Sequence, residues 1–485
     1  MAATGQGGIL GFGPQHDKEV AVGPISSPNW MYHKASDINL APQDDQRVFP
    51  GEIGGRPTPS GAYKAGIMTA GGFTINPRLK NTMGWLLYAA MGKVTASNKA
   101  LVYEGVMGSK KVTAAIQTIS TDLKTIPTPA KKLVVRALRG DNVTYTSEIT
   151  VTGTDSAAEV QTETFNFATG AAAGQRIDGL DCNPSDSAVG YEAIVGAKEF
   201  ASVTSVAIPA VSGIGTDVIN VTVGFEDAVG MTHDFEMDSV NPTMVPWLGF
   251  RKYIPPGNDG IGLGETYLDC KISGLTMSYP NDGIISARVD ALGRKFKLER
   301  NPTWASGVTY EDYESVPIGS VIGGYLRTPF FGEQKLSVVG ATVAWQNAPL
   351  DPRSEKVYGS PFLEDITIVG RSLAIDLVVK WVNPDLYQKI LTNSITGEEW
   401  SAVPFTTRLD MQSISPALMP GSMLPYGIRT QAQKVMLAMR GGIELAAGNA
   451  IMMRFQGTAL DVGGTFAKFS LTNLKQGSDY TWPAD

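Results

Sequence analysis

The sequence predicts a mainly β protein made of two similar units and one inserted β-sandwich. Stretches such as VTYTSEITVTG (143–153) and DVINVTVGF (217–225) alternate polar and apolar residues, which is the period of half-buried strands. The 54 glycines and 29 prolines supply the turns that an all-β chain needs. The order strand, Asn-Pro, short helix occurs twice in the chain, which indicates a duplication.

Composition argues against several classes of protein. The formal net charge of −7 is modest for 485 residues and disfavours tight wrapping of nucleic acid, which needs concentrated lysine and arginine. Cys182 and Cys270 are far apart, so we expect two buried free thiols, with a single bridge as the alternative. No signal peptide is recognisable and no apolar run approaches about 20 residues. We therefore expect a soluble protein that folds in a cytoplasm and does not bind membranes.

The N-terminal region is rich in glycine, proline and aspartate. Residues 1–44 are predicted to form an arm. The stretch PQDDQRVFPGEIGGRPTPSGAYKAG (42–66) is longer than an ordinary connection, so it is either a flexible arm or an extended loop that a neighbouring subunit orders. If a neighbour orders it, the candidate contact residues are Glu52, Arg56, Tyr63 and Lys64.

The segment NPRLKNTMGWLLYAAMG (76–92) predicts a short helix. Apolar residues recur at helical spacing, Asn76-Pro77 is a start signal, and Gly92 is a stop signal. Gly84 weakens the helix by about 1 kcal/mol but leaves room for close packing. A helix this short needs a sheet to lie on. The residues expected to pack there are Leu79, Met83, Trp85, Leu86, Leu87 and Ala90.

The second copy of this pattern is SLAIDLVVKWVNPDLYQKILTN (372–393), in which Tyr387, Ile390 and Leu391 are expected to pack on a sheet. IISARVDALG (284–293) also resembles AIMMRFQGTAL (450–460), with Arg288 and Arg454 in register. A chance match of short β patterns is the alternative to a duplication. The predicted organisation is an arm (1–44), a first unit (45–104 and 231–304), an inserted sandwich (105–230), and a second unit with a C-terminal arm (305–485).

No pattern for catalysis or cofactor binding emerges. His233 lies in THDFEMD (232–238), whose acidic residues suit a cation, but a solvated strand face is the more common reason for such a run. Nucleophile elbows and phosphate-binding loops are missing. The paired acids Asp44-Asp45 and Glu398-Glu399 have no sequence context that marks them as buried. We expect no enzyme activity, no metal and no cofactor.

VFPGEIGGRPTPSGAYKAG (48–66), followed by NPRLKNTMGWLLYAAMG (76–92), resembles the tail tube proteins of long-tailed (siphovirus-type) bacteriophages. SVIGGYLRTPFFGEQKLSVVGATVAW (320–345) is similar to the same family. The 127–225 block is similar to the immunoglobulin-like modules of phage virion proteins.

The resemblance implies two tube-type β-barrel or sandwich units, each flanked by a helix, plus an inserted immunoglobulin-like domain. Such proteins stack as rings of six tube units and form the channel for genome delivery. Two units per chain imply homotrimeric rings with pseudo-six-fold symmetry, and a homohexamer is the alternative. The implied partners are the tape measure, tail terminator and distal tail proteins, with DNA only transiently in the lumen. The implied location is the virion tail, assembled in the bacterial host cytoplasm.

Three other functions are compatible with parts of the sequence. A distal tail or baseplate hub protein shares the tube fold but forms a single ring. A carbohydrate-binding or adhesin β-sandwich would be expected to carry a signal peptide. A β-rich hydrolase would need a nucleophile and base that the sequence does not offer.

Overall fold

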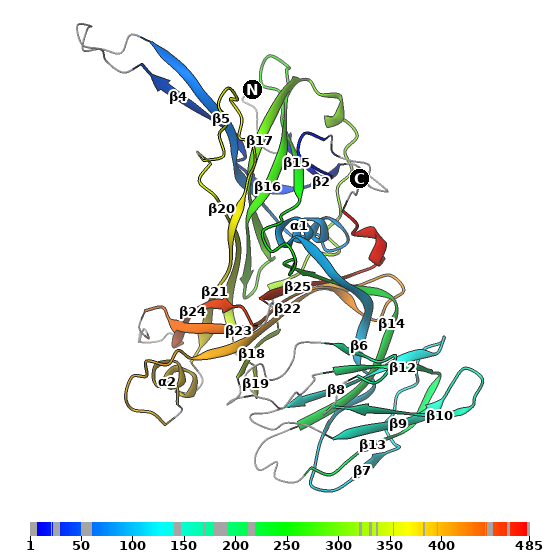
Figure 1. The fold of residues 1–485 in the computed structure, drawn as a ribbon. Helices are drawn as coiled ribbons and strands as arrows, with labels where there is room; N and C mark the ends of the chain where they lie inside the picture. The colour runs from blue at the N-terminus through cyan, green and yellow to red at the C-terminus, as the bar shows by residue number, and fades with distance from the viewer. Residues whose placement is uncertain are drawn as a thin grey trace.

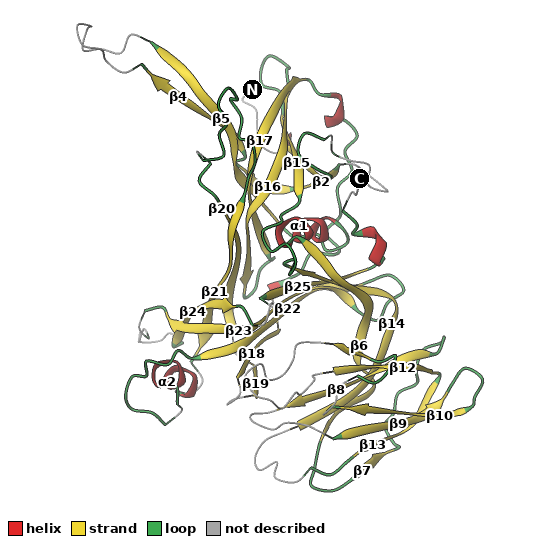
Figure 2. Cartoon of the chain, in the orientation of Figure 1, coloured by secondary structure: helices red, strands yellow, loops and turns green. Residues whose placement is uncertain are grey.

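The computed structural model describes residues 7–20, 22, 30–49, 61–139, 147–167, 171–178, 193–211, 219–319, 323–328, 332–335, 338–352, 354–381, 384–394, 396–441, 443, 450–462 and 466–482. Within these residues the chain is mainly β, as predicted, with two α-helices and two short 3₁₀ turns, Thr303–Ala305 and Gly477–Asp479 (Figures 1 and 2).

The first unit consists of elements on both sides of the insertion. They are β1 (Ile9–Gln15), β2 (Met31–His33), β3 (Ala35–Ile38), β4 (Ala41–Val48), β5 (Ala62–Ile75), α1 (Thr82–Met91), β15 (Trp247–Ile254), β16 (Leu263–Pro280) and β17 (Ser286–Arg300). The strands pair in the order β2–β1–β15–β16–β17–β5, and β5 then pairs with β3 and β4. Where the sequence predicts an N-terminal arm, β1 is buried along its whole length within this sheet.

The second unit repeats this order. It consists of β18 (Gly323–Thr328), β19 (Gly332–Lys335), β20 (Val338–Pro349), β21 (Ile368–Lys380), α2 (Asp385–Thr392), β22 (Thr406–Leu418), β23 (Pro425–Met439) and β24 (Met452–Leu460). Its strands pair as β19–β18–β22–β23–β24–β21–β20. The two units therefore match element for element, with β20 in the place of β3 and β4.

The strand register supports the same equivalence. Arg288 on β17 faces Thr74 on β5, and Arg454 on β24 faces Val378 on β21. In both units the helix begins shortly after that position. The two arginines, which the sequence places in register, therefore occupy equivalent sites in the two sheets.

Two ladders connect the units. β20 pairs antiparallel with β16 over residues 340–346 and 274–280. The last strand, β25 (Ala467–Asn473), pairs with β23 and with β14 (Ile219–Glu236). The sheet is thus continuous through both units, but it does not close on itself within the described residues. The predicted barrel is therefore not formed by one chain.

The insertion is attached by strands. β6 (Lys93–Lys111) and β14 form a long ladder that leaves the first unit and enters the sandwich (Figure 1). The predicted boundaries at 104/105 and 230/231 fall inside these two strands. The remaining strands are β7 (Gln117–Ile119), β8 (Lys131–Arg139), β9 (Glu148–Thr154), β10 (Val160–Asn166), β11 (Arg176–Asp178), β12 (Ala193–Phe200) and β13 (Ser202–Ile208).

The sandwich has a hydrophobic core of its own. A four-stranded sheet in the order β10–β9–β13–β7 packs against β6, β8, β12 and β14. The residues between the sheets form a cluster separate from the core of the two units. The likeness of this sandwich to immunoglobulin-like modules stays a prediction.

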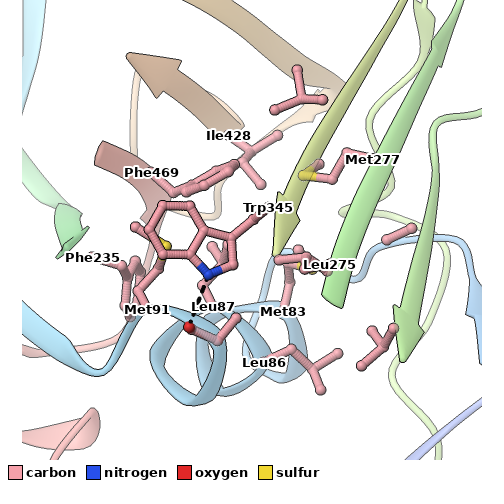
Figure 3. Packing of buried hydrophobic residues seen from close by; sticks show 14 of the residues in the cluster. Met83, Leu86, Leu87, Met91, Phe235, Leu275, Met277, Trp345, Ile428 and Phe469 are labelled. Atoms are coloured by element: carbon pink, nitrogen blue, oxygen red, sulfur yellow. Dashed lines mark hydrogen bonds between the residues drawn. The ribbon is translucent and has the colours of Figure 1, made fainter. Parts of the chain in front are cut away.

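Helix α1 lies in the main core and not on its surface. Nine of its ten residues are buried, because elements of both units enclose it (Figure 3). The prediction that this helix only flanks a sheet is therefore wrong. Leu79 is buried but precedes the helix: its N–H donates to Ser315 Oγ and its carbonyl accepts from Asn473. Asn473 takes the carbonyl that the Met83 N–H would bond in a longer helix, and that N–H bonds the Arg78 carbonyl instead (3.1 Å), so the helix begins at Thr82.

Replacing Gly84 with alanine should destabilise the protein by up to about 2 kcal/mol net, because overpacking a core usually costs about 1–3 kcal/mol. A Cβ on Gly84 would overlap the buried ring of Tyr480, and Asn473 hydrogen-bonds the Tyr480 hydroxyl (2.8 Å). The gain in helix propensity, about 1 kcal/mol, offsets only part of this. Urea denaturation measures the change. In the control Gly108→Ala, a Cβ meets no atom within 4 Å, and stability should stay near that of the parent.

Candidate assembly surfaces

The second unit holds the C-terminal end of α1. Trp345 Nε1 and Asn347 Nδ2 both donate to the carbonyl of Ala90, at 3.1 and 2.9 Å. Asn347 also donates to the Ile272 carbonyl on β16 (2.9 Å), and Arg371 donates to the Met91 carbonyl. Terminal helix carbonyls lack partners within their own helix. Strands β20 and β21 supply them here, which fastens the second unit to the first.

The C-terminal segment covers another side of α1. The rings of Tyr480 and Trp482 lie 5.7 and 5.8 Å from that of Trp85, and Trp482 also contacts Tyr88 at 4.9 Å. Offset and edge-to-face pairs at these distances are stabilising. Trp85, which the sequence predicts to be a packing residue, thus lies in an aromatic cluster at the junction between the units.

The N-terminal end of α1 is capped by a residue that is far away in the sequence. α1 has no acidic residue in its first turn, and Asn81 forms no side-chain cap. Instead, Glu311 Oε2 accepts from the Thr82 N–H at 2.8 Å, and burial raises the pKa of this carboxyl. Sequence reasoning missed Glu311, because its partner lies 229 residues away.

Helix α2 is less enclosed than α1. Its buried residues are Leu386 and Lys389. Tyr387 and Ile390 are partly buried against the main core, with Tyr387 5.9 Å from Trp381, and Leu391 is partly exposed. Leu386, which sequence reasoning did not single out, is a buried apolar contact of this helix.

The β4–β5 hairpin projects from the body of the chain (Figure 1). Among the predicted contact residues, Tyr63 is 44% exposed and Lys64 pairs with Asp44 at 2.8 Å. Phe49 is half exposed and its ring lies 5.3 Å from that of Tyr63. The other two predicted contact residues, Glu52 and Arg56, lie outside the described residues, as does Cys182. The hairpin thus presents an exposed aromatic pair to solvent.

The equivalent β20–β21 hairpin has part of its connecting segment buried, at Leu363 and Ile366, whereas Val357 and Tyr358 are exposed. Leu363, Ile366 and Ile368 pack against Val245 and Trp247 of the first unit. Backbone and ion-pair contacts add to this packing: the Ile67 N–H donates to the Pro361 carbonyl (2.9 Å), and Lys271 pairs with Asp365 (3.4 Å). One hairpin therefore wraps a neighbouring unit, whereas its counterpart has no unit to wrap within the chain.

A buried ionic cluster joins both units beside this wrapped segment. Asp269 is fully buried and accepts from Arg294 (3.0 Å), Gln15 Nε2 (3.3 Å) and the Glu19 N–H (2.8 Å). Arg294 in turn donates to the Leu363 carbonyl at 2.7 Å. Strand β1, the first-unit sheet and the β20–β21 connection therefore meet at one carboxylate.

The candidate cation ligands do not converge. His233 points to the core, where it contacts Ser97 Oγ (2.9 Å) and the Lys475 carbonyl (3.0 Å). Asp234 pairs instead with Lys468, and Asp238 pairs with Lys93. In the part of the chain that the structure describes, no group of three or more His, Cys, Asp or Glu is placed to hold a metal ion. Cys270 is a buried free thiol.

A model of the phage tail tube protein family matches residues 9–417. The chain belongs to this family. A comparison with curated proteins finds no match. Membership of the tail tube family makes the chain a structural protein of the virion tail, one that assembles with itself and contacts other tail proteins. Neither of the described helices has the length and apolar character needed to cross a membrane.

Proposed function

We propose that three chains form one ring of the tail tube, and that stacked rings make the channel through which the genome is delivered. The β16–β20 ladder supports this most, because it joins one unit to the next through strand edges. A head-to-tail contact that repeats generates a ring when its rotation closes. With two equivalent units per chain, a ring of six units needs three chains.

The strand order is compatible with a wide channel. Each unit contributes four successive strand positions: β3 and β4 together, β5, β17 and β16 in the first unit, and β20, β21, β24 and β23 in the second. Three chains would supply 24 positions. At about 4.8 Å between strands, the closed sheet is about 37 Å across before strand tilt widens it.

Charges on the sheet face opposite the helices support the passage of DNA. Arg288 bonds Asp37 (3.1 Å) and Asp290 (3.0 Å), and Arg440 bonds Asp376 (3.0 Å). The helices and the C-terminal segment pack on the other face, which we place on the outside of the ring. Arginines that already hold carboxylates bind phosphate weakly, so DNA would not be retained.

Electron microscopy of the purified protein tests the proposal. Stacked rings, or tubes, are the expected result. Single rings that never stack would instead favour another tube-fold component, such as a distal tail or baseplate hub protein. A monomer that persists at high concentration would contradict both.

Removing the sandwich should leave assembly intact. Val102 and Phe225 face each other in the β6–β14 ladder, so an Asn-Gly turn can replace residues 103–224. The shortened chain should form rings with the same number of chains and a smaller outer diameter, since the sandwich core is separate from the main core. Micrographs of parent and shortened chain compare the two. A shortened chain that keeps its β circular dichroism but forms no rings would place the sandwich in the tube wall.

A further inference from the structure

We infer that neighbouring chains join through one defined strand pairing: residues 40–43, at the free edge of β3 and β4, against residues 438–441 at the end of β23 in the next chain. The inference rests on the proposed ring and specifies its contact. The occupant of each edge is a second copy of this chain. The template is the β16–β20 ladder, which already joins two units within one chain.

The strand register identifies the first edge of the proposed pair, that of β3 and β4. On β20, Ala344 faces Ala374 of β21. On β4, Ala41 faces Ala70 of β5, and the register of the two units sets Ala70 level with Ala374. Ala41 is therefore the counterpart of Ala344.

The register of strand β3 gives the same alignment with β20. Asp37 faces Thr74, and Gly340 faces Val378. Thr74 and Val378 are the equivalent positions opposite the two matched arginines, so Asp37 is the counterpart of Gly340. Residues 37–43 thus correspond to residues 340–346, the part of β20 that pairs with β16.

The second edge of the proposed pair, at the end of β23, follows from its equivalence with β16. Thr276 on β16 faces Arg288 on one side and Ala344 on the other. In the second unit, the Arg440 N–H donates to the Arg454 carbonyl (2.9 Å), so Arg440 occupies the place of Thr276. The pairing across the ring is therefore Ala41 with Arg440.

Within the part of the chain that the structure describes, neither edge has a strand partner in the single chain, although the Leu40 carbonyl accepts from Lys252 Nζ (2.8 Å) and the Tyr267 hydroxyl (3.1 Å). Among the described residues, β3 and β4 pair only with β5. On the far side of β23, β22 ends its ladder with Thr406 opposite Met436, and Ala438 and Gly441 are exposed. Unpaired strand edges are templates for further strands. Pro42 lacks an N–H, so it can enter a ladder only through its carbonyl.

The hairpin tips provide a second, independent argument. In the connection of the β20–β21 hairpin, Leu363 and Ile366 are buried on the first unit of the same chain, whereas Val357 and Tyr358 are exposed. At the tip of the β4–β5 hairpin, the exposed fractions of Val48, Phe49 and Tyr63 are 58%, 50% and 44%. Placed on the second unit of the next chain, this hairpin would cover these apolar residues, as its counterpart covers Leu363 and Ile366.

Disulfide trapping tests the register. Facing residues of an antiparallel pair lie about 4.5–5.5 Å apart at Cα, within the range for a disulfide. The double variant Ala41→Cys/Arg440→Cys should cross-link in assembled tubes, and non-reducing gels should show linked dimers and trimers with the trimer as the largest species. Gln43→Cys/Ala438→Cys, a second facing pair in the same register, should give the same ladder. Ala41→Cys/Ala438→Cys, shifted by two residues, should cross-link much less.

The outcomes separate this inference from the proposed function. Tubes that form normally but give no cross-link with either facing pair would overturn the strand pairing and leave the tube intact. Linked species that extend past the trimer would overturn the closed three-chain ring. A parent chain that forms no rings would overturn the proposed function, and the pairing with it. The parent chain, whose Cys270 is buried, serves as the background for oxidation.

Discussion

Replacing Trp345 with alanine should lower the free energy of unfolding by about 3–5 kcal/mol, the usual range for truncating a buried tryptophan. The indole is fully buried at the junction of the two units, where it lies among side chains of α1 and of both sheets (Figure 3). Its Nε1 also bonds the Ala90 carbonyl and Asn347 Oδ1. The substitution therefore opens a cavity and removes one donor from the end of α1.

Trp345→Phe is the matched control, because it retains most of the apolar contact and loses the N–H. It should destabilise less than Trp345→Ala, since Asn347 still bonds the Ala90 carbonyl. Urea denaturation followed by circular dichroism measures both variants. An alanine variant within about 1 kcal/mol of the parent, well under the usual cost, would show that the units do not depend on this contact.

Replacing Asp269 with alanine should cost a similar amount, about 3–5 kcal/mol, because it leaves the buried Arg294 guanidinium with the exposed Glu19 carboxylate (3.5 Å) in place of a buried counter-charge. The side chain of Arg294 is only 3% exposed. The same substitution removes the acceptor for Gln15 and for the Glu19 N–H, so β1 should loosen from the sheet. Hydrogen exchange of β1 amides, together with urea denaturation, measures this.

Two further variants separate charge from hydrogen bonding. Asp269→Asn keeps an acceptor and tolerates the left-handed backbone at this position (φ 54°), so it should lie between parent and alanine variant. Asp269→Ala/Arg294→Met removes both charges and should recover part of the loss. A double variant as unstable as the sum of the single variants would contradict the ion-pair explanation.

Local patterns in the sequence predicted the β class, both helices and the duplication, because strand alternation and the Asn-Pro start signals lie within short stretches. The structure adds how the two copies are joined: β20 of the second unit pairs with β16 of the first. The placement of Arg288 and Arg454 in register came from sequence alone, and it sets the alignment of the two sheets.

The contacts that enclose α1 were not predictable in this way. Trp345 and Glu311 reach the helix from the second half of the chain, and Tyr480 reaches it from the C-terminal segment. No local period marks such distant partners. For the same reason the helix was expected on a surface, whereas it lies between the units. The N-terminal segment was predicted to be an arm because it is rich in glycine. Strand β1 within it is buried and belongs to the sheet. The contact roles of Tyr63 and Lys64 stay predictions.

The mass of a single ring tests the central claim most directly. One chain weighs 51.6 kDa, and the ring mass divided by this value gives the number of chains. Mass photometry of rings released from tubes, or of rings before stacking, measures the ring mass. The duplicated fold predicts a ring of three chain masses. A ring of six chain masses would contradict the claim that each chain supplies two of the six tube units.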